Sequence, residues 1–282
     1  MTALLGPRQV RALLRRHGIA PRRSAGQSFV VDPNTVRKVV RLSGVIAGDV
    51  VCEIGPGLGS LTLALREAGA RVVAVEVDAR LVRALSGVLA GDAGVRVIHA
   101  DALDVDLAAL VDGGPAALVA NLPYSVATPL VLRGLAAGAF DRLTVMVQRE
   151  VGRRWAAGVG DPFYGAVSVK VAVLADARVL SAVSRRAFLP EPNVDSVVVG
   201  LRPRPWDGPV DRGRVAALVD VGFAQRRKRL RNALSRPGLA PADVEAALSG
   251  VGLEPGARAE ELALADWVAL AACLPVPPGR RA

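Results

Sequence analysis

The sequence contains few of the residues that build disulfide-rich, metal-binding or membrane proteins. Its two cysteines, Cys52 and Cys273, are too few for a disulfide framework or a zinc cluster, which is typical of a reducing compartment. No apolar run is long enough to cross a bilayer. Residues 1–9 lack the basic region and apolar stretch of a secretory signal. We therefore expect a cytoplasmic protein with no membrane association.

Histidine and aromatic residues are also scarce. The two histidines, His17 and His99, lie far apart without ligand spacing, so no metal site is expected. Aromatic residues make up only 4% of the chain, but apolar residues make up 51%, enough for a large buried core. This composition excludes disorder over most of the chain.

Positive charge is the bulk property that points to a partner. The chain has 36 basic and 26 acidic residues, for a net charge of +10. Only Lys38, Lys170 and Lys228 are lysine, a preference for arginine that a genome rich in G and C explains without reference to function. The surplus of positive charge itself favours a polyanion such as nucleic acid.

Short β-branched runs alternate with helical patterns in the first half of the chain. Asp32 and Pro33 predict a helix start, with Asp as the N-cap and Pro at the first helical position. Helices are expected at 58–67 and 79–89, and strands at 50–54, 72–77, 95–99, 117–120 and 143–147. This alternation predicts an α/β class, Rossmann-like, doubly wound parallel sheet.

A proline-rich break at 202–209 divides the predicted organisation. We expect residues 1–204 to form the α/β domain, beginning with a basic segment at 1–30, and residues 205–274 to form a small all-α domain. The stretches 167–180 and 194–201 predict a helix and strands that close the sheet. Residues 275–282 are expected to be a frayed tail.

A glycine-rich turn follows the first predicted strand of the sheet and opens a helix. Gly55, Gly57 and Gly59 follow the acidic Glu53, and Ser60 stands where a dinucleotide fingerprint favours a nearby glycine. Glycines there let a ligand approach the backbone, and the helix N-terminus supplies N–H donors. The spacing favours S-adenosylmethionine over a dinucleotide.

Two further acids come at the ends of the next two predicted strands. Glu76 is placed to accept the ribose hydroxyls, and Asp101 is placed to accept the adenine amine. Ligands bind outside the carboxyl ends of parallel strands, where these acids would gather. Taken singly, each is equally typical of a solvated strand end or a helix cap.

The sequence from Asn121 to Tyr124, Asn-Leu-Pro-Tyr, is the most informative motif of the chain. An aromatic exocyclic amine is a poor nucleophile, because its lone pair is delocalised into the ring. The Asn121 side-chain oxygen and the Leu122 carbonyl can accept its two hydrogens, while Pro123 fixes the turn. Tyr124 offers a face for the base to stack on, worth about 1–3 kcal/mol.

Together these motifs make the chain resemble the ribosomal RNA adenine dimethyltransferases of the small subunit (the KsgA/RsmA and Dim1 family). The segments that carry the resemblance lie at 26–29, 53–59, 121–124, 148–151, 188–190, 192–196, 223–228 and 258–262. The resemblance implies dimethylation of two adjacent adenines in the 3′-terminal hairpin of small-subunit rRNA, in an assembling subunit, by a monomer.

The resemblance also assigns residues to the cofactor and the base. It implies cofactor contacts at Ser28, Val30, Gly55, Glu76, Asp101 and Asn121, to which the glycine turn adds Gly57. It places Phe188 opposite Tyr124 across the adenine. Three positions depart from the family pattern: Ser28 replaces Asn, Val30 replaces Leu, and Ser125 replaces Asn.

Basic clusters recur on segments expected to flank this site, and we expect them to bind rRNA phosphates. They are Arg22 and Arg23; Arg149, Arg153 and Arg154; and Arg226, Arg227, Lys228, Arg229 and Arg231. Such runs are otherwise typical of solvated helix faces.

Three alternatives remain open. A dinucleotide-dependent oxidoreductase shares the fold. Its fingerprint, however, includes a third nearby glycine, and its reaction does not require the Asn-Leu-Pro-Tyr motif. A resistance methyltransferase acting on large-subunit rRNA shares the reaction, although the segments at 223–228 and 258–262 favour the small-subunit enzyme. A non-enzymatic assembly factor would bind RNA without methylating it.

Overall fold

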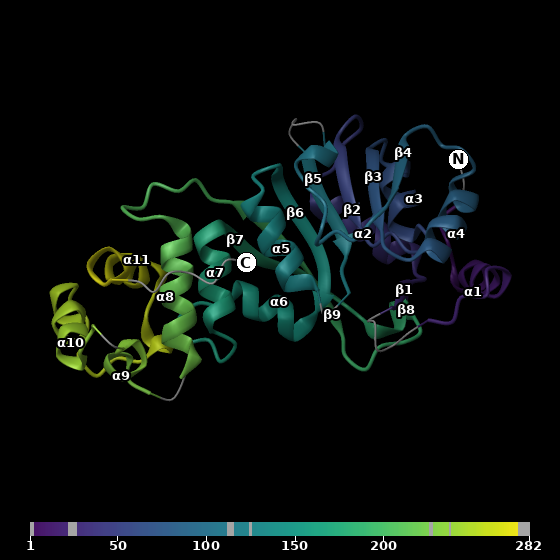
Figure 1. Ribbon diagram of the computed structural model, residues 1–282. Coiled ribbons are helices and arrows are strands. Elements are labelled where there is room, and N and C mark those ends of the chain that lie inside the picture. Colours follow the sequence, from purple (N-terminus) through teal and green to yellow (C-terminus); the bar gives the residue numbers. More distant parts are fainter. Residues whose placement is uncertain are drawn as a thin grey trace. The chain divides into compact units, whose positions relative to one another are not determined.

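The computed structural model describes residues 3–21, 27–111, 116–123, 126–225, 228–236 and 238–275. The chain divides into two compact units, one formed by 1–152 with 178–203 and the other by 153–177 with 204–282. Figure 1 shows the ribbon with its elements labelled.

The first unit is built on a mixed, seven-stranded sheet. The strand order is β4-β3-β2-β5-β6-β9-β7. Strands β2 to β6 run parallel to one another, and β9 pairs antiparallel with β6. The strands are β2 (Val50–Ile54), β3 (Arg71–Glu76), β4 (Val95–His99), β5 (Ala116–Asn121), β6 (Phe140–Gln148), β7 (Ala175–Val183) and β9 (Ser196–Pro203).

Helices cover both faces of this sheet, as a doubly wound fold requires. Alternate strand residues such as Val51, Ala74 and Val119 join the buried cluster that includes α2 to α4. On the opposite face, Gly134 of α5 lies against Leu118. The helices are α1 (Pro7–Arg16), α2 (Pro33–Ser43), α3 (Ser60–Glu67), α4 (Ala79–Leu89), α5 (Ala127–Ala136) and α6 (Arg149–Ala156), with short 3-10 turns at Ala109–Val111 and Arg185–Ala187.

A second, two-stranded sheet joins the N-terminal segment to a distant part of the chain. Strand β1 (Phe29–Val30) pairs antiparallel with β8 (Phe188–Leu189). The hydroxyl of Ser60, at the start of α3, donates to the Val30 carbonyl at 2.7 Å. These bonds fix β1 beside the glycine turn that precedes α3.

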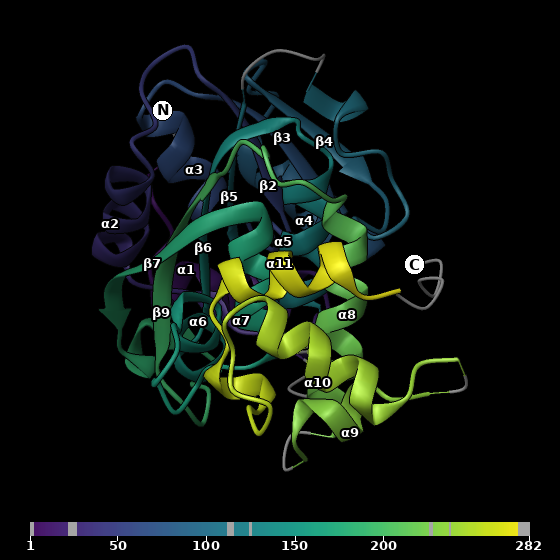
Figure 2. The same cartoon turned by 90° about the vertical axis from the view of Figure 1, so that its left-hand side faces the viewer.

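The second unit is helical and has its own core. Its helices are α7 (Ala166–Leu174), α8 (Arg212–Ala224), α9 (Leu230–Leu234), α10 (Pro241–Gly250) and α11 (Leu264–Cys273), with a 3-10 turn at Ala259–Glu261. Figure 2 shows α8 to α11 grouped together. Trp267 is fully buried at the centre, with its ring stacked on Phe223 at a centroid distance of 5.6 Å.

The segment 153–177 differs from the predicted domain boundary. The sequence pattern placed it in the first domain, but in the structure it belongs to the second unit. Tyr164 explains this placement, because its ring meets Phe223 edge-on and its hydroxyl donates to the Leu262 carbonyl at 2.6 Å. Val169 and Val173 of α7 are buried in the same core.

The N-cap of α2 tests the predicted helix start directly. The Asp32 carboxylate accepts hydrogen bonds from the backbone N–H groups of Asn34 and Thr35. We expect Asp32→Ala to lower the free energy of unfolding by about 1 kcal/mol, the usual cost of losing an N-cap. Urea denaturation checks this value, and Asp104→Ala, which alters an exposed aspartate, is the control. Equal stability of the two variants would contradict the assignment.

Candidate cofactor and base site

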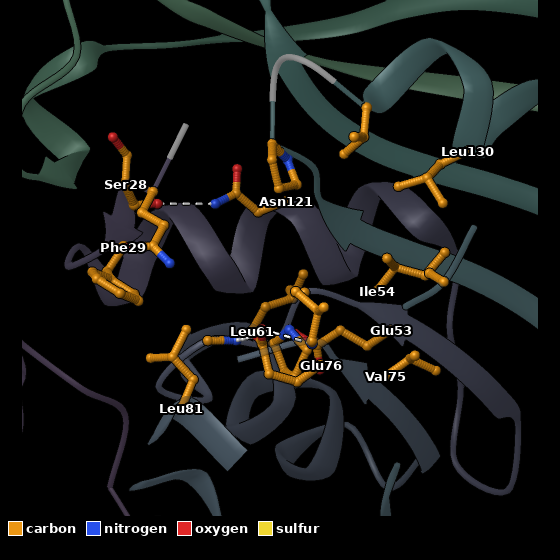
Figure 3. A pocket seen from close by; sticks show the side chains of 18 of the residues that line it. Ser28, Phe29, Glu53, Ile54, Leu61, Val75, Glu76, Leu81, Asn121 and Leu130 are labelled. Atoms are coloured by element: carbon orange, nitrogen blue, oxygen red, sulfur yellow. Dashed lines mark hydrogen bonds between the residues drawn. The ribbon is translucent and has the colours of Figure 1, made fainter. Parts of the chain in front are cut away.

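A cavity opens at the carboxyl ends of β2, β3 and β5 (Figure 3). The glycine turn between β2 and α3 forms part of its wall, with the segment 27–30 beside it. Its apolar lining includes Ile54, Leu81 and Leu130. The cavity therefore combines an apolar wall with backbone groups and carboxylates, as a small-molecule site requires.

The glycine turn needs residues without a side chain. Gly55 and Gly57 have positive φ angles of 68° and 58°, which other residues adopt only with strain. A Cβ on Gly57 would lie 3.0 Å from the Phe29 ring. The turn is thus closely covered by β1, and its backbone stays open to the cavity.

Glu76 organises this turn from the end of β3. Its Oε2 accepts a hydrogen bond from the Gly57 N–H at 3.1 Å, and its Oε1 accepts from Val77 and Asp78 at 2.9 and 3.0 Å. Only 5% of the residue is exposed, and burial raises the pKa of the carboxyl. Glu76 lines the cavity, so its remaining acceptor sites are available to a hydroxylated ligand.

Asp101 and residues of the segment 27–30 also line the cavity. Asp101 follows β4, is exposed, lines the cavity and accepts the Leu103 N–H at 2.8 Å. Ser28 and Val30 also line the cavity. The predicted cofactor residues thus lie together around one cavity.

Asn121 ends β5 and points its amide toward the N-terminal segment (Figure 3). Its Nδ2 donates to the Ser28 carbonyl at 3.2 Å, and the Ser28 hydroxyl donates to the Pro190 carbonyl at 3.2 Å. With Nδ2 engaged in this way, Oδ1 is the atom of the amide left to accept a hydrogen bond from a ligand. Ser28 keeps a polar contact here although it is shorter than the asparagine of the family pattern.

The other described residues of the Asn-Leu-Pro-Tyr motif, and Phe188, differ in whether they line the cavity. Pro123 lines the cavity. The Leu122 side chain is buried, and its N–H donates to the Met146 carbonyl at 3.1 Å. Tyr124 lies outside the described residues. Phe188 is buried in the first core, 4% exposed, opposite Val30 in the β1–β8 pair, and it does not line the cavity.

The predicted phosphate contacts are spread over both units. Arg149 begins α6 and lies 3.7 Å from the Asp195 carboxylate. Arg153 and Arg154 follow on the same helix, and Arg153 lies over the Phe163 ring at 4.9 Å. Lys228 and Arg229 are exposed, whereas Arg231 is half-buried and paired with Glu245. Arg22, Arg23, Arg226 and Arg227 lie outside the described residues.

Glu53 is a further candidate functional residue, for which the sequence predicted no contact with a ligand. It is completely buried, lines the cavity, and accepts a hydrogen bond from the Thr62 hydroxyl at 2.6 Å. Burial raises its pKa to about 8, and the nearby Glu76 adds to this rise. The signal in the sequence was an acid inside a strand that otherwise reads as core.

The raised pKa of Glu53 predicts a stability that falls with pH. Between the ordinary value of 4.5 and about 8, the native state binds one proton more than the unfolded state, so stability declines as pH rises through this window. Glu53→Gln keeps the contact with Thr62 but cannot titrate. As pH rises through this window, the free energy of unfolding of Glu53→Gln should increase by a few kcal/mol relative to that of the parent protein. Each unit of difference between the native and unfolded pKa corresponds to about 1.4 kcal/mol.

Urea unfolding at pH 5, 7 and 8.5 measures this difference. The control is Glu67→Gln, which alters an exposed carboxylate on the same helix as Thr62. If the free energies of unfolding of Glu53→Gln and the parent protein changed by the same amount with pH, Glu53 would not be the group that takes up the proton.

Among the described residues, no group of three or more His, Cys, Asp and Glu side chains is arranged to hold a metal ion. No helix in the described part of the chain is long and apolar enough to cross a membrane. Burial raises the pKa of the Cys52 thiol to about 12, so this cysteine is not an activated nucleophile.

Comparison with known proteins agrees with this geometry. Residues 19–274 match the family model described as ribosomal RNA adenine dimethylase. Ribosomal RNA small subunit methyltransferase A of Leifsonia xyli is 50% identical over 95% of this chain and 98% of its own length. The protein of the same name from Thermobifida fusca is 49% identical over 95% of each chain.

Solved structures share the fold. A dimethyladenosine transferase from Plasmodium falciparum superposes with a TM-score of 0.72 at 22% identity, covering 86% of this chain and 95% of its own. The 23S rRNA methyltransferase ErmE gives a TM-score of 0.67 at 27% identity, covering 87% and 99%. With a family model that matches nearly its whole length, the chain belongs to the ribosomal RNA adenine dimethylase family.

Proposed function

We propose that this protein dimethylates the exocyclic amines of two adjacent adenines in the 3′-terminal hairpin of small-subunit rRNA. The reaction class follows from the family: the chain is an S-adenosylmethionine-dependent rRNA adenine dimethyltransferase. The observation that carries the site is the placement of Asn121, whose amide is oriented by Ser28 at the edge of the cavity. The named relatives at 45–50% identity support the small subunit over the large one.

The cavity fits the methyl donor. S-adenosylmethionine supplies an electrophilic methyl group on a positively charged sulfur. The glycine turn exposes backbone to such a ligand, Glu76 has a buried carboxylate for the ribose hydroxyls, and Asp101 is available to the adenine amine. The carboxylates of Glu76 and Asp101 at the cavity also favour a cationic ligand over a pyrophosphate.

The residues of the chain then position the target amine. Asn121 Oδ1 and the Leu122 carbonyl accept the two amine hydrogens and favour a pyramidal, nucleophilic nitrogen. Tyr124 is proposed to stack on the flipped adenine, whereas Phe188, the other residue predicted to do so, is buried and is not given this role. The proton leaves to solvent. Holding two reactants in line can lower the barrier by about 7–11 kcal/mol. Flipping the base costs a few kcal/mol where the RNA is not already open.

Basic residues outside the cavity are suited to holding the RNA substrate. We propose that RNA phosphates are bound by two groups of basic residues. The described ones are Arg149, Arg153, Arg154, Lys228, Arg229 and Arg231, and the others are the predicted contacts Arg22, Arg23, Arg226 and Arg227. We propose that the protein works in the cytoplasm as a monomer. We also propose that it needs no metal, because the sulfonium is itself the electrophile.

Titration with cofactors separates the methyltransferase from the oxidoreductase. Calorimetry with S-adenosylmethionine and with NAD⁺ should show binding of the first and none of the second. Tight binding of NAD⁺ alone would contradict the proposal. Methylation assays under the same conditions on small and on large ribosomal subunits then identify the substrate. Label confined to large-subunit rRNA would favour the resistance enzyme.

A further inference from the structure

The first 31 residues carry a concentrated positive charge. They contain six arginines, at positions 8, 11, 15, 16, 22 and 23, and no Asp, Glu or Lys. With a net charge of +10 for the whole chain, the other residues together contribute only +4. The charge that favours a polyanion is therefore weighted toward this segment.

Helix α1 arranges part of this charge on one face. Val10 and Leu14 are buried, at 0% and 8% exposure, in the core that also holds Phe29 and Val30. Arg8, Arg11 and Arg15 recur at three- and four-residue spacing, so they share one face of the helix. Val10 and Leu14 point to a different side of a 3.6-residue helix, and all three arginines are exposed.

Among the described residues, the arginines of α1 have no acidic partner, unlike several other arginines of the first unit. Arg37, Arg66 and Arg142 pair with Glu67, Asp92 and Asp49. Within the described ranges, no carboxylate lies within ion-pair distance of an arginine of α1. Their charge is available to a partner outside the chain.

The chemistry of this face selects phosphate. Arginine presents a planar fork of donors that binds phosphate oxygens in pairs. The apolar face of α1 is already buried in the protein, so the helix has none left to insert into a lipid surface. The same core holds α1 and the strand β1 that lines the cavity. A phosphate bound to α1 is thus bound to the unit that contains the cavity.

We propose that Arg8, Arg11 and Arg15 of α1 form a binding face for the phosphate backbone of rRNA, additional to the basic clusters at 22–23, 149–154 and 226–231. This inference rests on the proposed function, since it names a further contact with the same substrate. Its role is to bind the RNA without taking part in the methyl transfer.

A triple substitution tests this face. Arg8→Gln, Arg11→Gln and Arg15→Gln together remove three charges while keeping good helix formers and the buried Val10 and Leu14. The matched control is the triple substitution of Arg41, Arg71 and Arg83 by Gln. These arginines are also exposed, and none of them forms an ion pair with a described residue. Both variants have the same net charge.

The measurement is the affinity for small ribosomal subunits that lack the modification, at a series of salt concentrations. Each phosphate contact contributes about 0.7–0.9 to the slope of log K against log salt. We expect the α1 variant to lose about 2–3 from this slope, and the control variant to keep the slope of the parent protein. S-adenosylmethionine affinity should be unchanged in both.

The outcomes separate this inference from the function on which it rests. Normal binding by the parent protein, with the same slope for the α1 variant as for the control, would overturn the α1 proposal alone. A parent protein that binds S-adenosylmethionine but neither binds nor methylates small subunits would contradict the proposed function, and this inference with it.

Discussion

Replacing Asn121 with alanine is expected to lower the rate of methyl transfer by about 10²–10³-fold, the usual cost of removing one preorganised hydrogen-bond partner of a reacting group. Asn121 Nδ2 is held by the Ser28 carbonyl, so the oriented Oδ1 is lost together with the side chain. Alanine leaves the amine lone pair delocalised in the ring. Single-turnover assays with saturating substrates measure this loss.

Binding measurements separate a lost acceptor from a lost fold. Asn121→Ala should keep most of the affinity for S-adenosylmethionine and for small subunits. Asn34→Ala, an exposed asparagine on α2, is the control and should methylate at the parent rate. Near-normal turnover by Asn121→Ala would show that the amine is activated by another group.

Replacing Glu76 with alanine is expected to weaken S-adenosylmethionine binding by roughly 10²-fold or more, since each hydrogen bond to a charged group contributes about 1.5–3 kcal/mol. The variant loses the acceptor for the ribose hydroxyls. It also leaves the N–H groups of Gly57, Val77 and Asp78 without their partner. The glycine turn then loses the bond that sets its conformation.

Calorimetric titration with S-adenosylmethionine measures the effect directly. Asp78→Asn is the control, because Asp78 lies two residues away as the N-cap of α4, a position that asparagine fills equally well. The control should bind within a few-fold of the parent protein. Unchanged affinity in Glu76→Ala would remove the carboxylate from the cofactor site.

Local patterns predicted the elements of the sheet closely. Strands β2 and β4 and helix α4 begin and end at the predicted residues. Short β-branched runs between turn residues fix the strands through nearby interactions, and Asp32 as an N-cap likewise fixes the start of α2. The acids Glu76 and Asp101 could be placed in one site, because parallel strands bring their carboxyl ends to the same edge.

Contacts between distant segments could not be predicted in the same way. The pairing of β1 with β8 joins residues more than 150 positions apart, and no local pattern announces two-residue strands. Another such contact is the hydrogen bond from Asn121 to the carbonyl of Ser28, the residue before β1. Phe188, predicted to face the adenine, is buried by the same pairing.

The division of the chain into two units could not be predicted for a similar reason. Residues 153–177 follow the sheet strands in sequence, so they read as part of the first domain. Their core residues, such as Tyr164 and Val173, pack with helices formed later in the chain. The apolar pattern shows that these residues are buried but not in which core.

The most direct test of the central claim is a methyl-transfer assay with labelled S-adenosylmethionine and small ribosomal subunits that lack the modification. Digestion and mass spectrometry would identify the labelled nucleotides and their positions. The account predicts dimethyladenosine at the two adjacent adenines of the 3′-terminal hairpin. No label in subunits that the protein binds tightly, or label only elsewhere in rRNA, would contradict it.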